Sequence, residues 1–217
     1  VECEAEVIVV NNASTDHTRE RALAVPGVKV VDEPRKGIVR ARQAGYVAAR
    51  GELIANIDSD TRLPEGWVKT VLREFERDPD LAALSGPLIY YDMSRIGRMM
   101  VRAFYAVGYL VYLVMHHVLH AGAMIQGGNF IVRRAVLDKI GGYDTTIEFY
   151  GEDTDVARRV SREGRVKWTF RLPIYSSARR MKGEGLVTVG LRYAINYVWV
   201  AVRGRPFTKD YKDIRPE

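Results

Sequence analysis

The amino-acid sequence predicts an α/β fold with a mostly parallel central sheet, to which apolar helices are added in the middle and at the C-terminus. Three observations support this prediction. Strand-like and helix-like segments alternate over the first 91 residues. Residues 7–10 form a β-branched apolar run, which is typical of a strand buried on both faces. Polar residues follow several predicted strands, at the positions where α/β proteins bind ligands.

Seven elements are predicted in the first 91 residues. In order, they are a strand over 6–10, a helix over 16–24, a strand over 28–31, a helix over 37–50, a strand over 53–57, a helix over 64–77 and a strand within 81–91. The sixth element illustrates the signals, because Pro64 is favoured in a first turn and Val71 and Phe75 recur on one helical face. Further along, residues 130–132 predict a strand and residues 156–163 a helix.

The composition is that of a globular protein with an uneven distribution of charge. Of the 217 residues, 47% are hydrophobic and 28% are charged, which excludes wholesale disorder. The single cysteine, Cys3, excludes an intrachain disulfide and a cysteine-based zinc site. The formal net charge of +6 divides into −4 for residues 1–157 and +10 for residues 158–217. The basic C-terminal part favours an anionic partner, such as a membrane surface, a phosphorylated ligand or a nucleic acid.

Two long apolar segments, residues 99–119 and 186–202, depart from the alternating pattern. Arg102 interrupts the first, and Arg192 and Asn196 interrupt the second. Neither segment therefore gives the roughly 18 consecutive apolar residues of a typical membrane span. Two main interpretations stay open: helices of the core or of an interface, and amphipathic helices that lie on a membrane surface. True membrane spans are the third interpretation.

A polar segment from Asn11 to Asp16 follows the first predicted strand. In one interpretation it is a strand-to-helix turn, with Ser14 or Thr15 as the N-cap of the next helix. In the other it is a nucleotide-binding loop, because amide side chains can hydrogen-bond to the edge of a base. The segment alone does not decide between the two.

Asp58 and Asp60 come directly after the strand predicted over residues 53–57. Two carboxylates at the end of a buried strand repel each other and are costly to desolvate. A hard divalent cation relieves this, and Mg²⁺ or Mn²⁺ typically takes one or two carboxylates together with phosphate oxygens. We therefore expect Asp58 and Asp60 to hold Mg²⁺ or Mn²⁺. The structural alternative is that Asp60 caps the turn before Pro64.

Two further segments combine glycine with polar residues. Gly127 and Gly128 precede Asn129 and the strand over 130–132, and paired glycines let a backbone approach a ligand closely. A tight turn into a strand has the same pattern. Glu152 and Asp153 begin a predicted helix, where acidic residues are favoured by the helix dipole. Alternatively they supply a general base, because burial and neighbouring carboxylates raise a carboxyl pKa toward the working range.

Taken in order and spacing, these segments resemble the family 2 glycosyltransferases of the GT-A fold. The matching stretches read EVIVVNNASTD, KGIVRARQAGYVAARGELIANIDSDTRLPEGW and GGNFIVRRAVLDKIGGYDTTIEFYGEDTDVARRVSREG. The resemblance extends from about Glu6 to Tyr175. It implies a Rossmann-like three-layer α/β/α fold and an enzyme that transfers a sugar from a nucleotide-sugar donor.

The resemblance implies roles for residues on the donor side. Asn12 and Asp16 fall in the segment that contacts the nucleoside of the donor in many members. Arg42 falls in a donor-side segment that reads ARQ here. Asp58 and Asp60 match the Asp-x-Asp motif that holds the ribose and the diphosphate-bound metal.

The resemblance also implies which residues perform the reaction. Asp153 matches the catalytic base, and Glu152 beside it is a second candidate for a catalytic carboxylate. Arg179 and Arg180 lie where some members place a basic group near the diphosphate. The acceptor-side residues are expected to be Gly127, Gly128 and Asn129.

The family's first strand and its nucleotide-contacting turn would precede Val1. We therefore expect one central strand to lack a partner and the base pocket to be open. We expect residues 1–180 to form the GT-A domain, with residues 92–125 as a helical acceptor-side insertion. Residues 181–217 are expected to form an amphipathic, membrane-associating helix and a basic tail.

The expected reaction is an inverting transfer of one sugar to an acceptor hydroxyl, with metal-assisted departure of the diphosphate. The Gln-x-x-Arg-Trp motif of polymerising synthases is not present, which favours the transfer of a single sugar. The apolar helices favour a lipid-linked or membrane-proximal acceptor and peripheral membrane contact. These features predict a cytoplasmic protein at the inner face of the cytoplasmic membrane, acting in cell-envelope polysaccharide synthesis.

Two other functions are consistent with the sequence. One is an inactive or truncated relative that only binds a nucleotide, a lipid or a partner. The other is a nucleotidyltransferase, which also combines an α/β sheet with acidic metal ligands. We expect no nucleic-acid partner, because no recognised reading motif accompanies the basic residues. His116 and His120 have a spacing that can bind a metal, but no acidic third ligand is nearby, which favours surface or interface histidines.

Overall fold

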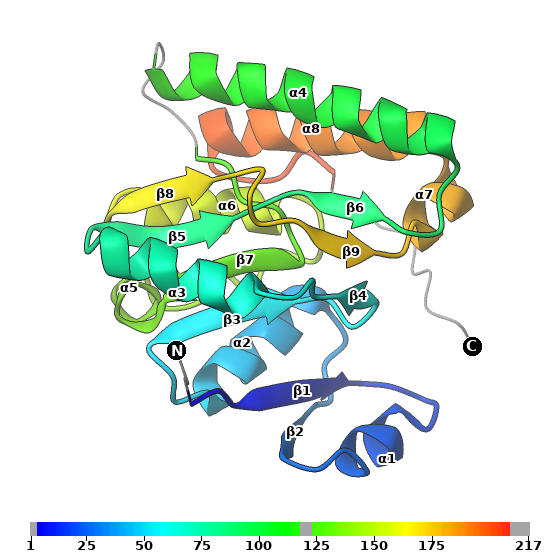
Figure 1. Ribbon diagram of the computed structural model, residues 1–217, viewed down its shortest axis with the longest axis vertical. Coiled ribbons are helices and arrows are strands. Elements are labelled where there is room, and N and C mark those ends of the chain that lie inside the picture. Colours follow the sequence, from blue (N-terminus) through cyan, green and yellow to red (C-terminus); the bar gives the residue numbers. More distant parts are fainter. Residues whose placement is uncertain (1–3, 118–122, 209–217) are drawn as a thin grey trace.

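The computed structural model describes residues 4–117 and 123–208, and Figure 1 shows how the elements are arranged. In chain order they are β1 (Val7–Asn12), α1 (Thr18–Leu23), β2 (Val28–Glu33), α2 (Ile38–Ala48), β3 (Leu53–Ile57), β4 (Thr61–Arg62), α3 (Trp67–Arg77), β5 (Leu81–Ser85), β6 (Leu88–Tyr90), α4 (Arg95–His117), β7 (Asn129–Arg133), α5 (Arg134–Lys139), α6 (Glu152–Val160), β8 (Arg165–Trp168), β9 (Ile174–Ser176), α7 (Arg179–Glu184) and α8 (Leu186–Arg203). Cys3, His120 and the basic tail from residue 209 onward lie outside the described residues.

The largest sheet has four strands in the order β3-β7-β5-β8. β8 runs parallel to β5, whereas β7 runs antiparallel to both β3 and β5. Three of the four strands therefore point the same way, as the alternation of strands and helices predicts. β7 is the exception, because it enters the sheet only after the long excursion of the chain through α4.

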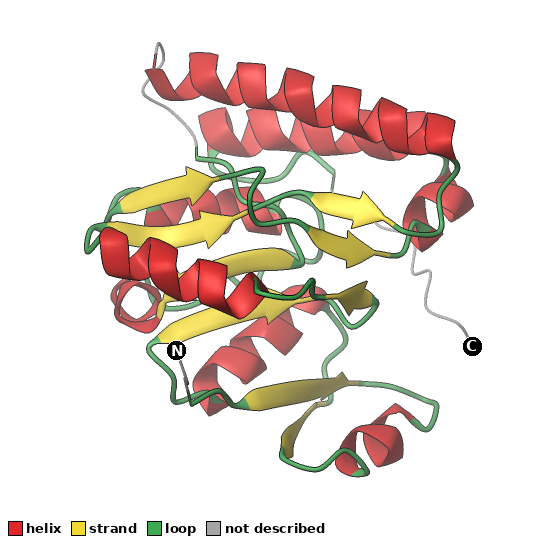
Figure 2. Cartoon of the chain, viewed as in Figure 1, coloured by secondary structure: helices red, strands yellow, loops and turns green. Residues whose placement is uncertain are grey.

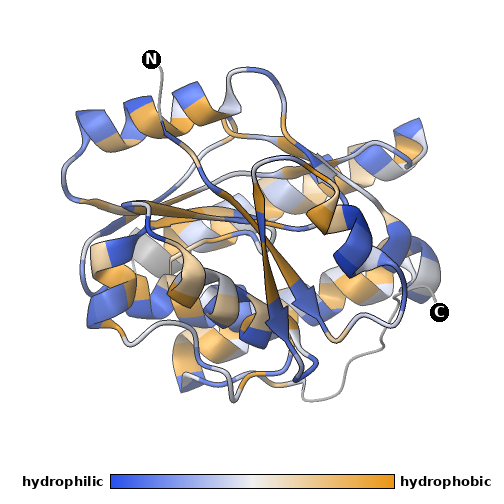
Figure 3. Ribbon diagram, turned by 90° about the horizontal axis from the view of Figure 1, so that it is seen from below, coloured by the Kyte–Doolittle hydropathy of each residue, from blue (hydrophilic) through white to orange (hydrophobic). Residues whose placement is uncertain are grey.

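Helices cover both faces of this sheet, which gives the three layers of an α/β/α fold (Figure 1). Successive residues of β7 belong to two different cores, because strand side chains alternate in direction. Phe130 and Val132 pack with residues of α2, α5 and α6, whereas Ile131 packs with residues of α3 and α4. Figure 3 shows strands that are apolar over most of their length, although β1 and β2 end in polar residues. Burial on both faces explains why the strands read as continuous apolar runs.

β1 and β3 each have one paired edge and one edge that faces a large cavity. β1 pairs in parallel with β2, and β3 pairs with β7. Ile8 and Val10 of β1 and Ile54 of β3 line the cavity between them. Among the described residues, no strand pairs with the second edge of either β1 or β3. This arrangement agrees with the expectation that a central strand lacks a partner.

The two apolar segments form α4 and α8, which lie side by side along one end of the molecule (Figures 1 and 2). α8 also packs against α6 and α7, and it buries Val189, Asn196 and Val200. Within residues 4–117 and 123–208, the structure contains no helix that combines the length and the apolar character of a membrane span. His116 and His117 belong to the last turn of α4.

Most predicted elements are present, and their ends differ by a few residues. The strand over residues 53–57 is confirmed residue for residue as β3. The segment 81–91 contains two strands, β5 and β6, that belong to different sheets. α6 begins at Glu152 and not at residue 156, because acidic residues occupy its first turn.

One interpretation of the segment from Asn11 to Asp16 makes Ser14 or Thr15 the N-cap of the first helix, and the structure contradicts this assignment. His17 occupies the cap position of α1 and makes no side-chain cap hydrogen bond, so neither Ser14 nor Thr15 has this role. The carboxylate of Asp16 instead accepts a hydrogen bond from the Thr18 amide at 3.0 Å. The turn from β1 into α1 is therefore longer than the sequence pattern indicates.

Candidate active site

The turn after β3 carries two carboxylates. Asp58 follows Ile57, and its backbone carbonyl accepts hydrogen bonds from the amide of Thr61 at 3.2 Å and the hydroxyl of Thr61 at 2.6 Å. Asp58 and Asp60 both line the cavity. Burial and the nearby charge of Asp58 raise the pKa of Asp60, whereas Arg179, at 3.6 Å from its carboxylate, opposes this.

Glu152 and Asp153 form the first turn of α6 and line the same cavity. Gly151 precedes them in the left-handed conformation, with φ of +79°, and a Cβ there would lie 2.7 Å from Val200 of α8. Asp153 Oδ2 accepts a hydrogen bond from the Gly127 amide at 3.1 Å. Burial raises the pKa of Asp153, although this hydrogen bond opposes the shift. A half-buried carboxylate with a raised pKa at the edge of a cavity is suited to accept a proton.

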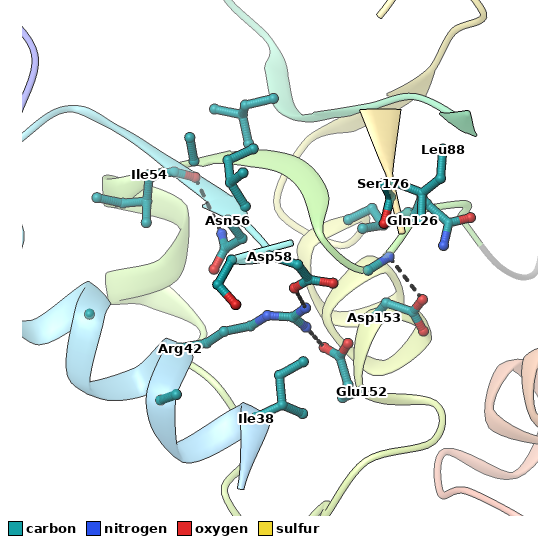
Figure 4. A pocket seen from close by; sticks show the side chains of 18 of the residues that line it. Ile38, Arg42, Ile54, Asn56, Asp58, Leu88, Gln126, Glu152, Asp153 and Ser176 are labelled. Carbon is teal, nitrogen blue, oxygen red and sulfur yellow. Dashed lines mark hydrogen bonds and ion pairs between the residues drawn. The ribbon is translucent and has the colours of Figure 1, made fainter. Parts of the chain in front are cut away.

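Arg42 of α2 connects the two pairs of carboxylates (Figure 4). Its side chain, 8% exposed, forms an ion pair with Glu152, whose side chain is 9% exposed, and one of its nitrogens lies 3.5 Å from Asp58 Oδ1. The guanidinium also lies 5.2 Å from the ring centroid of Phe130. Burial opposes the charge of Arg42, but Glu152 and Asp58 raise its pKa overall. Burial also raises the pKa of Glu152 to about 7.

The glycine pair lies between these acidic groups. Gly127 binds Asp153 through its amide, and the amide of Asn129 closes a tight turn onto the carbonyl of Gln126 at 3.1 Å. Gly128 has φ of +80°, and a Cβ at this position would overlap the carboxylate of Asp58. Glycine is therefore required here both by the left-handed backbone and by the close approach of Asp58.

Asn129 is fully buried and anchors the turn that contains the glycine pair, without lining the cavity itself. Its side-chain amide donates hydrogen bonds to the carbonyls of Gly86 at 3.0 Å and Leu172 at 2.8 Å. Its backbone carbonyl accepts a hydrogen bond from the hydroxyl of Ser85 at 2.7 Å. Asn129 does not line the cavity. The structure thus gives it a supporting position behind the loop, where the sequence led us to expect an acceptor contact.

Asn12 lines the cavity, whereas Asp16 does not. The Asn12 side chain donates hydrogen bonds to the carbonyls of Glu33 at 3.1 Å and Arg35 at 2.8 Å. Its side-chain oxygen accepts a hydrogen bond from the Gly37 amide at 2.8 Å. Asn12 therefore holds the end of β1 to the loop before α2. Asp16 is exposed and belongs to the turn that precedes α1.

Arg179 and Arg180 begin α7, and both line the cavity. Arg180 pairs with Glu184 at 2.6 Å and lies 4.2 Å from the ring centroid of Phe149. Glu184 also pairs with Arg192 of α8 at 2.5 Å. Sequence reasoning missed Glu184, although its i, i+4 spacing from Arg180 was a usable signal.

Asp92 is a second residue that sequence reasoning missed. Its carboxylate accepts hydrogen bonds from the Ala178 amide at 2.7 Å, the Ser177 hydroxyl at 3.1 Å and the Lys182 ammonium at 2.9 Å. Burial opposes the charge, but these donors lower the pKa of Asp92 to about 2. Asp92 thereby fixes the start of α7 and the two arginines that follow. Nothing in the local sequence pattern points to this role.

One cavity of about 1140 Å³ brings most of the expected site residues together. The expected residues that line it are Asn12, Arg42, Asp58, Asp60, Gly127, Glu152, Asp153, Arg179 and Arg180. Asp16, Gly128 and Asn129 are not among the lining residues. The cavity extends in one direction between β1 and β3 and in another between α4 and α8.

Asp58 and Asp60 are the residues that would hold a divalent metal. In the part of the chain that the structure describes, no three His, Cys, Asp or Glu side chains form a ready-made metal site. The protein would therefore supply two carboxylates, which fits Mg²⁺ or Mn²⁺ bound together with phosphate oxygens. Burial and the charge of Asp58, which raise the pKa of Asp60, are the effects that a cation would offset.

A sequence model of glycosyl transferase family 2 matches residues 2–141. The chain belongs to this family. One relative is polypeptide N-acetylgalactosaminyltransferase 5 of Caenorhabditis elegans, which is 37% identical over 81 residues, covering 34% of this chain and 13% of that protein. Glucosyl-dolichyl phosphate glucuronosyltransferase of Haloferax volcanii is 27% identical over 115 residues, covering 52% of this chain and 36% of that protein. The glycosyltransferase chain thus spans about a third or less of these relatives.

Solved structures support the GT-A fold of this family member. One is glucosyl-3-phosphoglycerate synthase of Mycobacterium tuberculosis, in complex with Mn²⁺, uridine diphosphate and glucosyl-3-phosphoglycerate. It is similar with a TM-score of 0.61 at 19% identity, and the match covers 90% of this chain and 68% of that chain. At this identity the similarity establishes the fold, and family membership decides against the nucleotidyltransferase interpretation.

Proposed function

We propose that this glycosyltransferase transfers one sugar from a nucleotide-sugar donor to an acceptor hydroxyl, with inversion at the anomeric carbon. The observation that carries the proposal is that Asp153, Asp58 and Asp60 line one cavity, with Arg42 and the glycine pair between them. This arrangement suits a reaction in which one carboxylate activates the acceptor and the others bind the leaving group. Family membership supports the reaction class.

On the donor side, Asp58 and Asp60 are the residues that would hold Mg²⁺ or Mn²⁺ together with the donor diphosphate. When bound, the metal supplies Lewis-acid stabilisation to the departing diphosphate. Arg179, 3.6 Å from Asp60, and Arg180 bring positive charge to the same part of the cavity. Asn12, which lines the cavity at the end of β1, is the residue that we assign to the nucleoside side.

On the acceptor side, Asp153 accepts the proton of the attacking hydroxyl. The acceptor oxygen forms a bond to the anomeric carbon while the bond from that carbon to the diphosphate oxygen breaks. The bonding electron pair leaves with the diphosphate, and attack from the opposite face inverts the configuration. The Gly127 amide, 3.1 Å from Asp153 Oδ2, fixes the orientation of this carboxylate. Positioning of this kind contributes much of the rate.

Glu152 acts on the site through Arg42 in this proposal. Its ion pair with Arg42 holds it away from the acceptor, and Arg42 in turn reaches Asp58. The pair therefore sets the relative position of the donor-binding and base-bearing segments. We assign Glu152 and Arg42 as positioning residues on this ground, and keep Asp153 as the base.

The acceptor in this proposal is lipid-linked or membrane-proximal, and the protein contacts the inner face of the cytoplasmic membrane from the cytoplasm. The exposed apolar side chains of α4 and α8 support this part of the proposal. We also keep the division into a transferase domain, 1–180, and a C-terminal membrane-associating part, 181–217. Such an enzyme would serve cell-envelope polysaccharide synthesis.

Asp153→Asn tests the proposal. Transfer should fall about 10²–10⁴-fold, as is typical for loss of a general base. The rise in thermal stability produced by uridine or guanosine diphosphate with Mn²⁺ should persist, because the donor-side residues are unchanged. Asp80→Asn, at an exposed position outside the cavity lining, is the matched control and should keep full activity.

Two outcomes would contradict the assignment. Turnover by Asp153→Asn at near wild-type rate would exclude Asp153 as the base. A wild-type protein that is stabilised by a nucleoside diphosphate but transfers no sugar from a panel of nucleotide sugars would be a binding protein. The observation that favours this second candidate, a binding protein, is that β1 and β3 each have an unpaired edge facing the cavity.

A further inference from the structure

We infer that the groove between α4 and α8 binds the apolar chain of the acceptor, so that the acceptor's sugar head reaches Asp153. This inference rests on the proposed function and adds the site that recognises the acceptor. We call this part of the cavity the α4–α8 groove. It is lined by Phe104, Val107, Gly108 and Val111 of α4 and by Ala194, Tyr197 and Val198 of α8.

The first argument is that the groove is continuous with the site. The same cavity contains Asp153 and Gly127 at one end and the groove residues at the other. Tyr105 of α4 connects them, because its hydroxyl donates a hydrogen bond to Gln126 Oε1 at 3.0 Å, next to the glycine pair. A molecule that extends from Asp153 along this direction leaves a polar region and enters an apolar one. An acceptor with a polar head and an apolar tail matches that change.

The second argument is the chemistry of the groove walls. Its lining residues carry no charge, and Phe104, Val107 and Val198 are 41%, 60% and 45% exposed. Apolar side chains that remain this accessible next to an active site are typical of a ligand or membrane contact. They lose contact with water when an alkyl chain occupies the groove.

The third argument is charge. Neither α4 nor α8 contains an acidic residue, whereas α4 carries Arg95, Arg98 and Arg102 and α8 carries Arg192 and Arg203. Arg192 lies within α8 and pairs with Glu184, which leaves the three arginines near the start of α4 and Arg203 at the end of α8. Apolar helices with arginines near an end are suited to the interface of an anionic membrane, where a lipid-linked acceptor resides. This charge pattern favours a lipid over a second copy of the chain, because two such faces would repel each other.

The groove offers a precise position for a test. A Cβ added at Gly108 meets no atom within 4 Å, so a large side chain at this position would extend into open groove space. Leu110 is two residues further along α4, is 61% exposed and does not line the cavity. Gly108→Trp therefore fills the groove, and Leu110→Trp places the same side chain on the same helix outside it.

The test measures binding of 11-(dansylamino)undecanoic acid by fluorescence, with dodecyl and methyl β-glucoside as competitors below the micelle concentration. Each buried methylene strengthens binding about fourfold, so dodecyl glucoside should compete and methyl glucoside should not. Gly108→Trp should weaken probe binding by about tenfold or more, the loss of at least two methylene contacts. Leu110→Trp should bind like the wild type. Circular dichroism shows whether both variants fold. If Gly108→Trp does not fold, Ala194→Asp on α8 is used as the groove variant in its place.

Equal competition by the two glucosides would overturn the inference, as would unchanged probe binding in both groove variants. Sedimentation experiments could also show that the wild-type protein is a dimer, while probe binding changes only in Leu110→Trp. This result would assign the exposed face to a second copy of the chain and would also overturn the inference. Stabilisation by a nucleoside diphosphate with Mn²⁺, measured on the same samples, tests the proposed function separately. If the protein binds the nucleotide but not the alkyl probe, only the inference about the groove is wrong. If the protein binds the alkyl probe but not the nucleotide, the groove assignment is supported and the proposed transfer reaction is contradicted.

Discussion

The contributions of Arg42 and Glu152 to the free energy of unfolding should depend strongly on each other, because the two side chains form a buried ion pair. A double-mutant cycle can measure this coupling. The cycle consists of Arg42→Met, Glu152→Gln and the double variant, because methionine and glutamine keep most of the volume of the side chains they replace. Both native side chains are less than 10% exposed. Each single substitution therefore leaves one buried polar or charged group without its principal partner.

The expected magnitudes follow from this burial. Breaking a buried ion pair from one side costs about 3–5 kcal/mol of unfolding free energy. Relief is available in each single variant: Glu152 can take up a proton because burial already raises its pKa to about 7, and Arg42 retains Asp58 at 3.5 Å. We therefore expect about 3 kcal/mol for each single variant, the lower end of the range. The double variant should lose about 3 kcal/mol as well, which gives a coupling of about 3 kcal/mol.

The assay is urea unfolding followed by circular dichroism at pH 6 and pH 8. In Arg42→Met, the loss should be smaller at pH 6, because the unpaired Glu152 is then protonated and its burial costs less. In a chain of this size, each kcal/mol corresponds to about 2–4 °C in the melting temperature, so thermal unfolding provides a second reading. Single losses that add within about 0.5 kcal/mol in the double variant would refute the idea of a coupled pair.

Three further predictions concern the donor side. Gly128→Ala should weaken binding of uridine diphosphate with Mn²⁺ by about tenfold or more in calorimetry, because the new Cβ displaces Asp58; an unchanged affinity would contradict this. Asp60→Asn should abolish the Mn²⁺ dependence of nucleotide binding but change stability by less than about 1 kcal/mol, because burial and Asp58 already disfavour the charge; a larger loss of stability would argue for a structural role. Asp92→Asn should lower stability by about 1 kcal/mol at neutral pH, after allowance for solvent screening. Since the pKa of Asp92 is lowered to about 2, this difference should be present above about pH 4 and disappear as the pH falls toward 2, and a constant difference in denaturation curves would contradict it.

The sequence predicts the elements of this fold well where burial controls the pattern. β3 contributes Ile54 to one core, whereas Leu53 and Ile57 pack against the other, and this run is sufficient to predict both ends of the strand. At β1 the polar residues Asn11 and Asn12 continue the strand, since they still pair with Asp32 and Glu33 of β2. Polar residues at the end of a strand give no local sign of pairing, so the strand was predicted too short. The place of β7 between β3 and β5 is likewise a property of the whole chain.

The site shows the same division between local and distant information. The positions of Asp58 and Asp60 follow from the strand before them, and those of Glu152 and Asp153 from the helix they begin. The contact between Arg42 and Glu152 joins residues far apart in the chain, and no local pattern encodes it. Asn129 is polar and lies next to the glycine pair, which suggested a ligand contact. Only the structure shows that the side-chain NH2 of Asn129 donates both of its hydrogens to the carbonyls of Gly86 and Leu172.

The second edges of β1 and β3 have a consequence for amide hydrogen exchange. In a strand, successive amides point to opposite sides, so roughly half of those in β1 and β3 are directed away from their partners β2 and β7. These amides should exchange quickly even though they belong to regular strands, whereas their immediate neighbours exchange only when the sheet opens. The exchange pattern along residues 7–12 and 53–57 should therefore alternate. An extended peptide that enters between the two strands would abolish the alternation, so exchange rates would report its arrival residue by residue.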